Sequence, residues 1–380
     1  MKKLIRDNVF RIEQYEPGMP IEVIKKELAL ESESSKLASN ENPLGPSPLA
    51  IDAIKKSLDD GNLYPDNKCY YLRKRIAEHL GVPHQNIGVG NGTTELIYLI
   101  GVAFLNPGET FIMSESTFIM AKMVAQVMDS RLIEVPLKEY KHDLDTILNT
   151  ISKDTKIVYF DNPMNPIGTM KTRQEFLKFM EKVPEDIIVV FDEAYYEYVN
   201  REDYPNTLKF IEEGRNVIVL RTFSKMYGLA GFRVGYCAAK EAFIDAINRV
   251  SPPFSVNRFA QIGAAAALKD KEHVKKTLEM NESGKRFLYE NFKKMSVFYI
   301  PSETNFVTID IKTDAKRFSE ELQRRNVIIR PLTMYRKPTF LRVTIGTPEQ
   351  NKKFIEAFKQ IYQNMIERPE ISKKEYVQPD

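Results

Sequence analysis

Short apolar runs alternate with amphipathic stretches along the first two thirds of the chain. The runs are rich in β-branched and aromatic residues, which predicts strands. They span 86–90, 110–114, 131–135, 156–160, 187–191, 216–220 and 235–239. The stretches around them have a helical period and span 48–58, 71–80, 95–104, 118–128, 143–149 and 172–181. Strands that are apolar throughout and alternate with helices indicate an α/β domain with a large, mostly parallel sheet, covered on both faces.

The pattern changes after residue 257. Residues 258–294 have a helical period, as one helix or two, and Tyr299 and Ile300 open a smaller α+β region. Its predicted strands are 305–311, 327–330 and 341–345, and its predicted helices are 315–325 and 349–365. We therefore expect a large α/β domain over 46–257 and, over 258–380, a linking helix with a small C-terminal α+β domain.

We expect residues 1–45 to form an N-terminal arm rather than a domain. A short amphipathic helix is predicted at 21–30, and the segment 39–48 is rich in proline and turn-forming residues. On composition alone, the segment 39–48 is better interpreted as a linker.

Composition narrows the range of partners. The 380 residues carry 55 basic and 52 acidic side chains, so the net charge is only +3, which favours neither nucleic acid nor an anionic membrane as a partner. No apolar run is long enough for a membrane span or a signal core, so we expect a cytoplasmic protein. Cys69 and Cys237 are expected to be reduced thiols. The four histidines are scattered and are interpreted as surface or capping residues, with no metal site.

Lys225 is the first candidate for chemistry. It follows the predicted strand 216–220 in a polar turn with Thr222 and Ser224, and Arg233 comes eight residues later. A lysine at the end of a buried strand can be kept partly desolvated, so its neutral amine can form a Schiff base with an aldehyde cofactor. The neighbouring hydroxyl and guanidinium donors suit a phosphate. The turn alone is also compatible with an ordinary solvated lysine.

Other polar side chains follow predicted strands in the same way. Asp192 ends one apolar run, Tyr195 comes three residues later, and Asn165 follows another run. Ligands of parallel sheets bind beyond the carboxyl ends of the strands, so we expect these residues to meet in one site. Asp192 could pair with a pyridinium nitrogen or could cap a turn. Asn165 and Tyr195 could donate hydrogen bonds to a cofactor ring oxygen.

The segment Asn91-Gly92-Thr93-Thr94 joins a predicted strand to a predicted helix. Free backbone N–H groups at such a helix N-terminus can hold an anion such as a phosphate. Threonine is also a common N-cap residue, so this segment alone leaves the capping interpretation open.

Together these motifs resemble the fold-type I pyridoxal-phosphate aminotransferases. The order is Asn-Pro-Ile-Gly from Asn165, Asp-Glu-Ala-Tyr from Asp192, and Thr-Phe-Ser-Lys from Thr222, with Arg233 beyond. Within this group the chain looks like the histidinol-phosphate aminotransferase branch, and the resemblance extends from about Tyr15 to about Ile361. The segments that carry the branch resemblance are 15–18, 40–48, 64–66, 90–95, 305–306, 330–332 and 341–347.

The resemblance implies a role for each matching residue. Lys225 would carry the cofactor and then serve as the base and acid of the proton shift, and Asp192 would pair with the pyridinium nitrogen. Asn165 and Tyr195 would hold the ring oxygen, and Phe118 would stack on the ring. The implied phosphate contacts are Thr93, Thr94, Thr222, Ser224 and Arg233, with Tyr64 reaching across from a partner subunit. Gly92 is a further implied cofactor contact. The implied substrate contacts are Tyr15, Asn42, Arg330 and Arg342.

The implied activity is the transfer of an amino group between an amine donor and 2-oxoglutarate or glutamate. The resemblance favours histidinol phosphate or a related aromatic amino acid as the donor, in amino-acid biosynthesis, and a homodimer. Two positions depart from the branch, which commonly has an acidic residue where this chain has Thr94 and a tyrosine where it has Phe118. A decarboxylase acting on an amino-acid phosphate such as threonine phosphate stays open, as do a binding module without catalysis and a plain α/β domain.

Overall fold

The computed structural model describes residues 4–12 and 34–367. These residues form two compact units. The first unit comprises 4–12, 44–165 and 169–277, and the second comprises 34–43, 166–168 and 278–367. Tyr15 and the helix expected at 21–30 lie outside the described residues. The domain boundaries expected near residues 45 and 257 stay a prediction.

The first unit is built on a seven-stranded sheet with the order β2-β8-β7-β6-β5-β3-β4. Strands β3 to β7 run parallel, and β8 is antiparallel to both of its neighbours. The strands are β2 (Ile87–Gly90), β3 (Thr110–Ser114), β4 (Arg131–Val135), β5 (Thr155–Asp161), β6 (Ile188–Asp192), β7 (Val217–Thr222) and β8 (Gly235–Ala239). The predicted large, mostly parallel sheet is confirmed.

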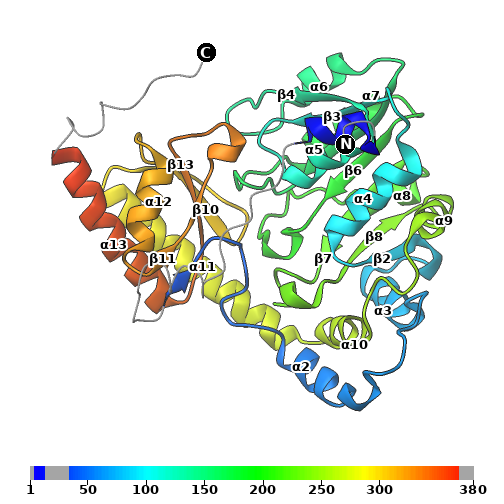
Figure 1. The fold of residues 1–380 in the computed structure, drawn as a ribbon, viewed down its shortest axis with the longest axis horizontal. Helices are drawn as coiled ribbons and strands as arrows, with labels where there is room; N and C mark the ends of the chain where they lie inside the picture. Colours follow the sequence, from blue (N-terminus) through cyan, green and yellow to red (C-terminus); the bar gives the residue numbers. More distant parts are fainter. Residues whose placement is uncertain (1–3, 13–33, 368–380) are drawn as a thin grey trace. The chain divides into compact units, whose positions relative to one another are not determined.

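Helices cover both faces of this sheet because successive residues of its strands point to opposite sides. On one face, Tyr159 and Val190 pack with α4 (Thr93–Phe104), α5 (Ile119–Val127) and α9 (Glu241–Val250). On the other face, the next residues, Phe160 and Phe191, form an aromatic cluster with side chains of α7 (Arg173–Lys182) and α8 (Thr207–Glu212). Figure 1 shows this layering around the labelled strands.

The described part of the first unit has four further helices. They are α2 (Pro48–Lys55), α3 (Tyr70–Leu80), α6 (Leu144–Thr150) and α10 (Arg258–Ala267). Short 3-10 turns occur at Asp7–Arg11, Leu58–Asp60, His84–Asn86, Tyr196–Tyr198 and Ala230–Phe232. The N-cap residue of α2 is Ser47, whose hydroxyl also donates to Asp270. The helical pattern of 258–294 resolves into two helices, α10 and the longer α11 (Lys271–Lys294).

The second unit contains a four-stranded antiparallel sheet with the order β12-β13-β10-β9. Its elements are β9 (Phe298–Ile300), β10 (Phe306–Asp310), α12 (Ala315–Gln323), β12 (Arg330–Pro331), a 3-10 turn at Thr333–Tyr335, β13 (Phe340–Thr344) and α13 (Pro348–Glu367). A separate parallel pair joins β1 (Ser35–Lys36) to β11 (Val327–Ile328). The prediction of one strand over 327–330 is wrong, because the segment changes sheets between Ile328 and Arg330. The α+β class of this region is confirmed.

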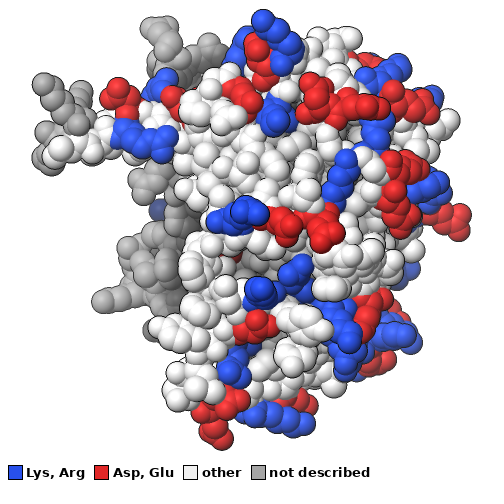
Figure 2. Space-filling view, turned by 90° about the vertical axis from the view of Figure 1, so that its right-hand side faces the viewer, with Lys and Arg blue, Asp and Glu red and all other residues white. Residues whose placement is uncertain are grey.

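Charges of both signs are mixed on the face shown in Figure 2, as expected for a net charge of +3. Among the described helices, none is long and apolar enough to cross a membrane. Cys69 and Cys237 are buried free thiols, as predicted, and burial raises the pKa of each thiol to about 12. The interpretation of the histidines is wrong for two of them, since His142 and His273 are buried.

Candidate active site

A cavity of about 160 Å³ lies where the parallel strands β5, β6 and β7 end. Asp161, Asp192 and Thr222 are the last residues of these three strands, and all three line the cavity. The lining residues are Thr93, Thr94, Phe118, Asp161, Pro163, Asn165, Asp192, Ala194, Tyr195, Thr222, Ser224, Lys225, Ala230 and Arg233. The polar residues after these strands therefore lie around one cavity.

Ten of the residues expected from the sequence line this cavity. The ten are Thr93, Thr94, Phe118, Asn165, Asp192, Tyr195, Thr222, Ser224, Lys225 and Arg233. Gly92 adjoins the cavity as the N-cap residue of α4. Asn42, Arg330 and Arg342 belong to the second unit, and Tyr15 lies outside the described residues.

Asp192 is a buried carboxyl group that accepts two hydrogen bonds. The hydroxyl of Tyr159 donates to Oδ2 at 2.7 Å, and the backbone N–H of Ala194 donates to Oδ1 at 3.1 Å. Burial raises the pKa of Asp192 to about 6, against the opposing effects of these hydrogen bonds and of the nearby Lys225 charge. Asp192 is therefore ionised at neutral pH, as an anion that pairs with a pyridinium nitrogen must be.

Lys225 follows β7 in a compact polar turn. The backbone N–H of Ser224 donates to Thr222 Oγ1 at 3.0 Å, which closes the turn just before the lysine. Lys225 Nζ lies 5.9 Å from the centre of the buried Tyr195 ring. The turn thus places the amine near the Tyr195 ring, at the end of the strand next to the one that carries Asp192.

The N-terminus of α4 and Arg233 form the cationic end of the cavity. Gly92 is the N-cap residue with a φ of 79°, so Thr93 and Thr94 occupy the first turn of a 12-residue helix. A Cβ atom at Gly92 would clash with Arg233 Nη2, so glycine leaves the room that the guanidinium occupies. Free N–H groups, two threonine hydroxyls and a guanidinium together suit a phosphate.

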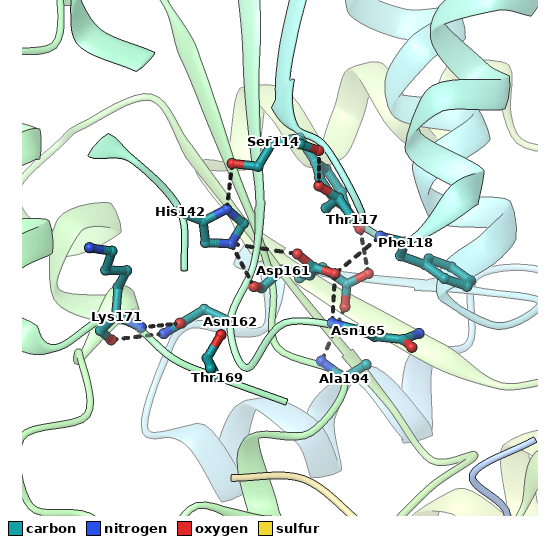
Figure 3. Close-up of polar contacts among 12 residues, drawn as sticks. Ser114, Thr117, Phe118, His142, Asp161, Asn162, Asn165, Thr169, Lys171 and Ala194 are labelled. Atoms are coloured by element: carbon teal, nitrogen blue, oxygen red, sulfur yellow. Dashed lines mark hydrogen bonds and ion pairs between the residues drawn. The ribbon is translucent and has the colours of Figure 1, made fainter. Parts of the chain in front are cut away.

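Three residues that the sequence did not single out support this site. Tyr159 holds Asp192, and Asp161 lines the cavity beside it. His142 contacts the backbone of Asp161 behind the cavity wall (Figure 3). For Asp161, a carboxylate directly after an apolar run was the available signal, the same one that singled out Asp192.

Two of the expected substrate residues face each other in the second unit. Arg330 of β12 and Arg342 of β13 are partners in the antiparallel register. Arg342 is buried, and its Nη2 donates to the backbone carbonyl of Ala38 at 2.7 Å. Asn42 is also buried in this unit. Arg330 and Arg342 are therefore neighbours on one face of this sheet.

Tyr64 does not line the cavity of its own chain. Its side chain is 79% exposed, and its ring stacks on Phe254 with 4.8 Å between the ring centres.

The cavity matches the chemistry of pyridoxal phosphate, the cofactor expected from the sequence. It has donors for a phosphate at Thr93, Thr94 and Arg233, and an anion for a ring nitrogen at Asp192. Phe118 offers an aromatic wall for the ring. The residues present therefore fit this cofactor.

Similar proteins share both sequence and fold with this chain. The profile of the family described as aminotransferase class I and II matches residues 33–358. Histidinol-phosphate aminotransferase of Moorella thermoacetica is 44% identical over 357 residues, which cover 94% of this chain and 92% of that protein. The protein of the same name from Caldicellulosiruptor saccharolyticus is 43% identical and covers 94% of this chain and 100% of its own length.

A solved structure agrees with these relatives. Histidinol-phosphate aminotransferase of Sinorhizobium meliloti, in complex with pyridoxal-5'-phosphate, superposes with a TM-score of 0.86 at 25% identity. The match covers 95% of this chain and 98% of that one. Since the family profile spans most of the sequence and the relatives cover nearly all of it, the chain belongs to the class I and II aminotransferases.

Proposed function

We propose that this aminotransferase uses pyridoxal phosphate to transfer an amino group from histidinol phosphate to 2-oxoglutarate, which yields glutamate. One observation carries the proposal: Lys225, Asp192, Tyr195 and Asn165 line one cavity whose other end gathers phosphate donors. The name shared by relatives at 43–44% identity supports the choice of donor.

The chain's own residues would hold the cofactor at both ends. Thr93, Thr94, Thr222, Ser224 and Arg233 would bind its phosphate, and Asp192 would pair with its ring nitrogen. Asn165 and Tyr195 would donate to its ring oxygen. When bound, pyridoxal phosphate supplies an aldehyde for covalent attachment of amines and a ring that takes up electrons from the substrate carbon.

Lys225 is the catalytic residue of this proposal. Its Nζ is the amine that would hold the cofactor covalently through the cofactor's aldehyde. Nζ would also accept the proton from the substrate carbon that bears the amine and would later donate it back. General acid–base work of this kind is typically worth about a hundredfold to ten-thousandfold in rate.

Asp192 would act by its charge. Its carboxylate is buried and held on both oxygens, so its position is fixed before the reaction begins. A fixed anion beside the ring nitrogen favours the protonated ring, which accepts negative charge from the substrate carbon. Tyr159 supports this role by holding Oδ2.

Asn42, Arg330 and Arg342 are proposed to bind the substrates. The guanidinium groups of Arg330 and Arg342 suit the carboxylates of glutamate and 2-oxoglutarate, because arginine binds a carboxylate with two parallel hydrogen bonds. Tyr15, which lies outside the described residues, keeps its proposed role on the substrate side.

A homodimer in the cytoplasm is also part of this proposal. Tyr64 is exposed, and Tyr70 and Tyr71 nearby in sequence are exposed as well, so this segment presents aromatic side chains for a contact. We propose that Tyr64 binds the cofactor phosphate of the partner subunit.

Donor selectivity tests the proposed function. The cofactor-loaded protein is supplied with 2-oxoglutarate and with histidinol phosphate, phenylalanine or threonine phosphate in turn, and the glutamate formed is measured. We expect the largest kcat/KM with histidinol phosphate. Release of carbon dioxide from threonine phosphate without any need for 2-oxoglutarate would support the decarboxylase instead.

A further inference from the structure

Asp161 is a buried carboxyl group in the cavity wall to which the proposed function gives no role. It is the last residue of β5, and its register partner on the neighbouring strand β6 is Asp192. Adjacent strands lie about 4.8 Å apart, and register partners in parallel strands point to the same face, so the two carboxyl groups lie side by side. Only Asp192 is needed to pair with a ring nitrogen.

One oxygen of Asp161 joins two separate segments of the cavity wall. Its Oδ2 accepts the backbone N–H of Phe118 at 3.1 Å and the backbone N–H of Asn165 at 2.9 Å. Phe118 precedes α5, and Asn165 lies in the loop after β5. Figure 3 shows both bonds converging on the carboxylate between these segments.

His142 fixes the backbone of Asp161 from behind. Its Nε2 lies 2.9 Å from the carbonyl oxygen of Asp161, and its Nδ1 lies 2.8 Å from Ser114 Oγ (Figure 3). A carbonyl can only accept, so Nε2 carries the hydrogen. Burial lowers the pKa of His142 to about 4, so the ring is neutral and Nδ1 accepts the hydrogen of the Ser114 hydroxyl.

The hydrogen bonds of Asp161 matter more to this arrangement than its charge. Burial and the neighbouring Asp192 raise its pKa, whereas the bonds from Asn165 and Phe118 lower it. Its other oxygen, Oδ1, is buried without a hydrogen-bond partner among the described residues and lies 3.5 Å from His142 Nε2. The surroundings thus disfavour the anionic form of Asp161. The hydrogen bonds from Phe118 and Asn165 need only one accepting oxygen.

We propose that Asp161 is a positioning residue for the cofactor, whose Oδ2 holds the backbone of Phe118 and Asn165. By fixing these two segments, it sets the Phe118 ring against the cofactor ring and the Asn165 amide against the ring oxygen. This inference rests on the proposed function, because it requires the cofactor to lie in this cavity.

Two substitutions separate the accepting oxygen from the charge. Asp161→Asn keeps an oxygen that can accept both N–H groups, whereas Asp161→Ala leaves both buried groups without an acceptor. The cofactor-free proteins are titrated with pyridoxal phosphate, and Kd is read from visible absorbance, with the visible circular dichroism of the bound cofactor as a second signal. We expect Asp161→Ala to raise Kd about tenfold or more and to change the dichroism. Asp161→Asn should stay within about threefold of the unsubstituted protein.

Asp270→Ala is the matched control. Asp270 is also a buried carboxylate that accepts backbone N–H groups, from Leu49 and His273, but it does not line the cavity. The Asp270→Ala substitution should lower the unfolding temperature without changing the Kd for pyridoxal phosphate or the dichroism. If Asp161→Ala does not fold, Asp161→Ser takes its place with the same expectation, because its shorter hydroxyl cannot reach both N–H groups.

The outcomes divide clearly. If Asp161→Asn and Asp161→Ala weaken cofactor binding equally, the effect belongs to the charge and the inference is overturned. Unchanged cofactor binding in both variants would also overturn it. A change in Kd for Asp270→Ala as large as that for Asp161→Ala would reduce the effect to general stability and also overturn it. If the unsubstituted protein binds no pyridoxal phosphate, the proposed function itself fails, and the inference fails with it.

Discussion

At the scale of single residues, Asp192 shows how burial and function oppose each other. The carboxyl group lies in a buried position that raises its pKa from 3.8 to about 6. The proposed role nevertheless requires the anion at neutral pH. Without a bound cation, the folded protein therefore holds an anion that the unfolded chain accommodates more easily in water.

This opposition predicts a pH-dependent effect of Asp192→Asn on stability. Between about pH 4 and pH 6 the folded protein binds more protons at this site than the unfolded chain, so the stability contributed by Asp192 is present in acid and is lost as pH rises. The Asp192→Asn variant has no carboxyl group at this position, so it does not lose this stability as pH rises. On moving from pH 4 to pH 7, the cofactor-free variant should gain up to about 3 kcal/mol relative to the unsubstituted protein.

Denaturant unfolding of both cofactor-free proteins at the two pH values measures this difference. If the stabilities of the two proteins change equally between pH 4 and pH 7, the pKa assigned to Asp192 is contradicted. The same substitution should weaken activity in the loaded enzyme, because the ring nitrogen loses its anion.

The sequence predicted the chemistry-bearing residues better than the residues that support them. Lys225, Asp192 and Asn165 follow apolar runs, so their positions at strand ends could be anticipated. Tyr159 lies inside an apolar run, where a tyrosine is ordinary, and only the register of β5 and β6 brings its hydroxyl to Asp192. His142 was misassigned because its burial depends on contacts with β3 and β5, which no local pattern encodes.

At the scale of elements, the junction between β2 and α4 determines how a phosphate can be bound. Gly92 combines a positive φ with close contact to the Arg233 guanidinium. Arg233 itself has a φ of 59°, and its Nη1 donates to the carbonyl of Ala230 at 3.0 Å. Because Gly92 has no side chain, the Arg233 guanidinium can lie close to the N-terminus of α4.

We predict that Gly92→Ala weakens cofactor binding through Arg233. The new methyl group would displace the guanidinium and would also strain the backbone by about 1–3 kcal/mol, because a φ of 79° with a ψ of 165° is essentially confined to glycine. Gly108→Ala is the control, since Gly108 has a φ of 83° but no atom within 4 Å of the place that a Cβ would take. Both variants should lose stability, and only Gly92→Ala should raise the Kd for pyridoxal phosphate. Equal Kd values for the two variants would contradict the contact.

Most elements could be predicted from the sequence because their patterns are strong. Strands such as Thr110–Ser114 and Arg131–Val135 have the predicted bounds. The split between β11 and β12 was missed because Ile329 links them without a turn signal. Arg221 in β7 is buried because it pairs with Glu193 at 2.8 Å, a partner that the sequence did not reveal.

At the scale of the whole molecule, the proposed homodimer makes cofactor binding depend on association. Tyr64→Phe removes one hydroxyl donor to the partner's phosphate site, so the dimer should bind pyridoxal phosphate about tenfold more weakly. Tyr71→Phe is the control, since its ring is similarly exposed at 77%. Sedimentation should show dimers for both variants. A monomeric protein with full cofactor affinity, or equal affinities for the two variants, would contradict the proposed contact.

The central claim is that Lys225 and its cavity perform amino-group transfer from histidinol phosphate. The most direct measurement is the visible absorbance of the cofactor-loaded protein during addition of histidinol phosphate and then 2-oxoglutarate, with Lys225→Ala as the control. We predict that the yellow colour fades with the first compound and returns with the second, and that the control completes no such cycle at a comparable rate. Yellow protein that histidinol phosphate leaves unchanged, or a Lys225→Ala protein that cycles equally fast, would contradict the account.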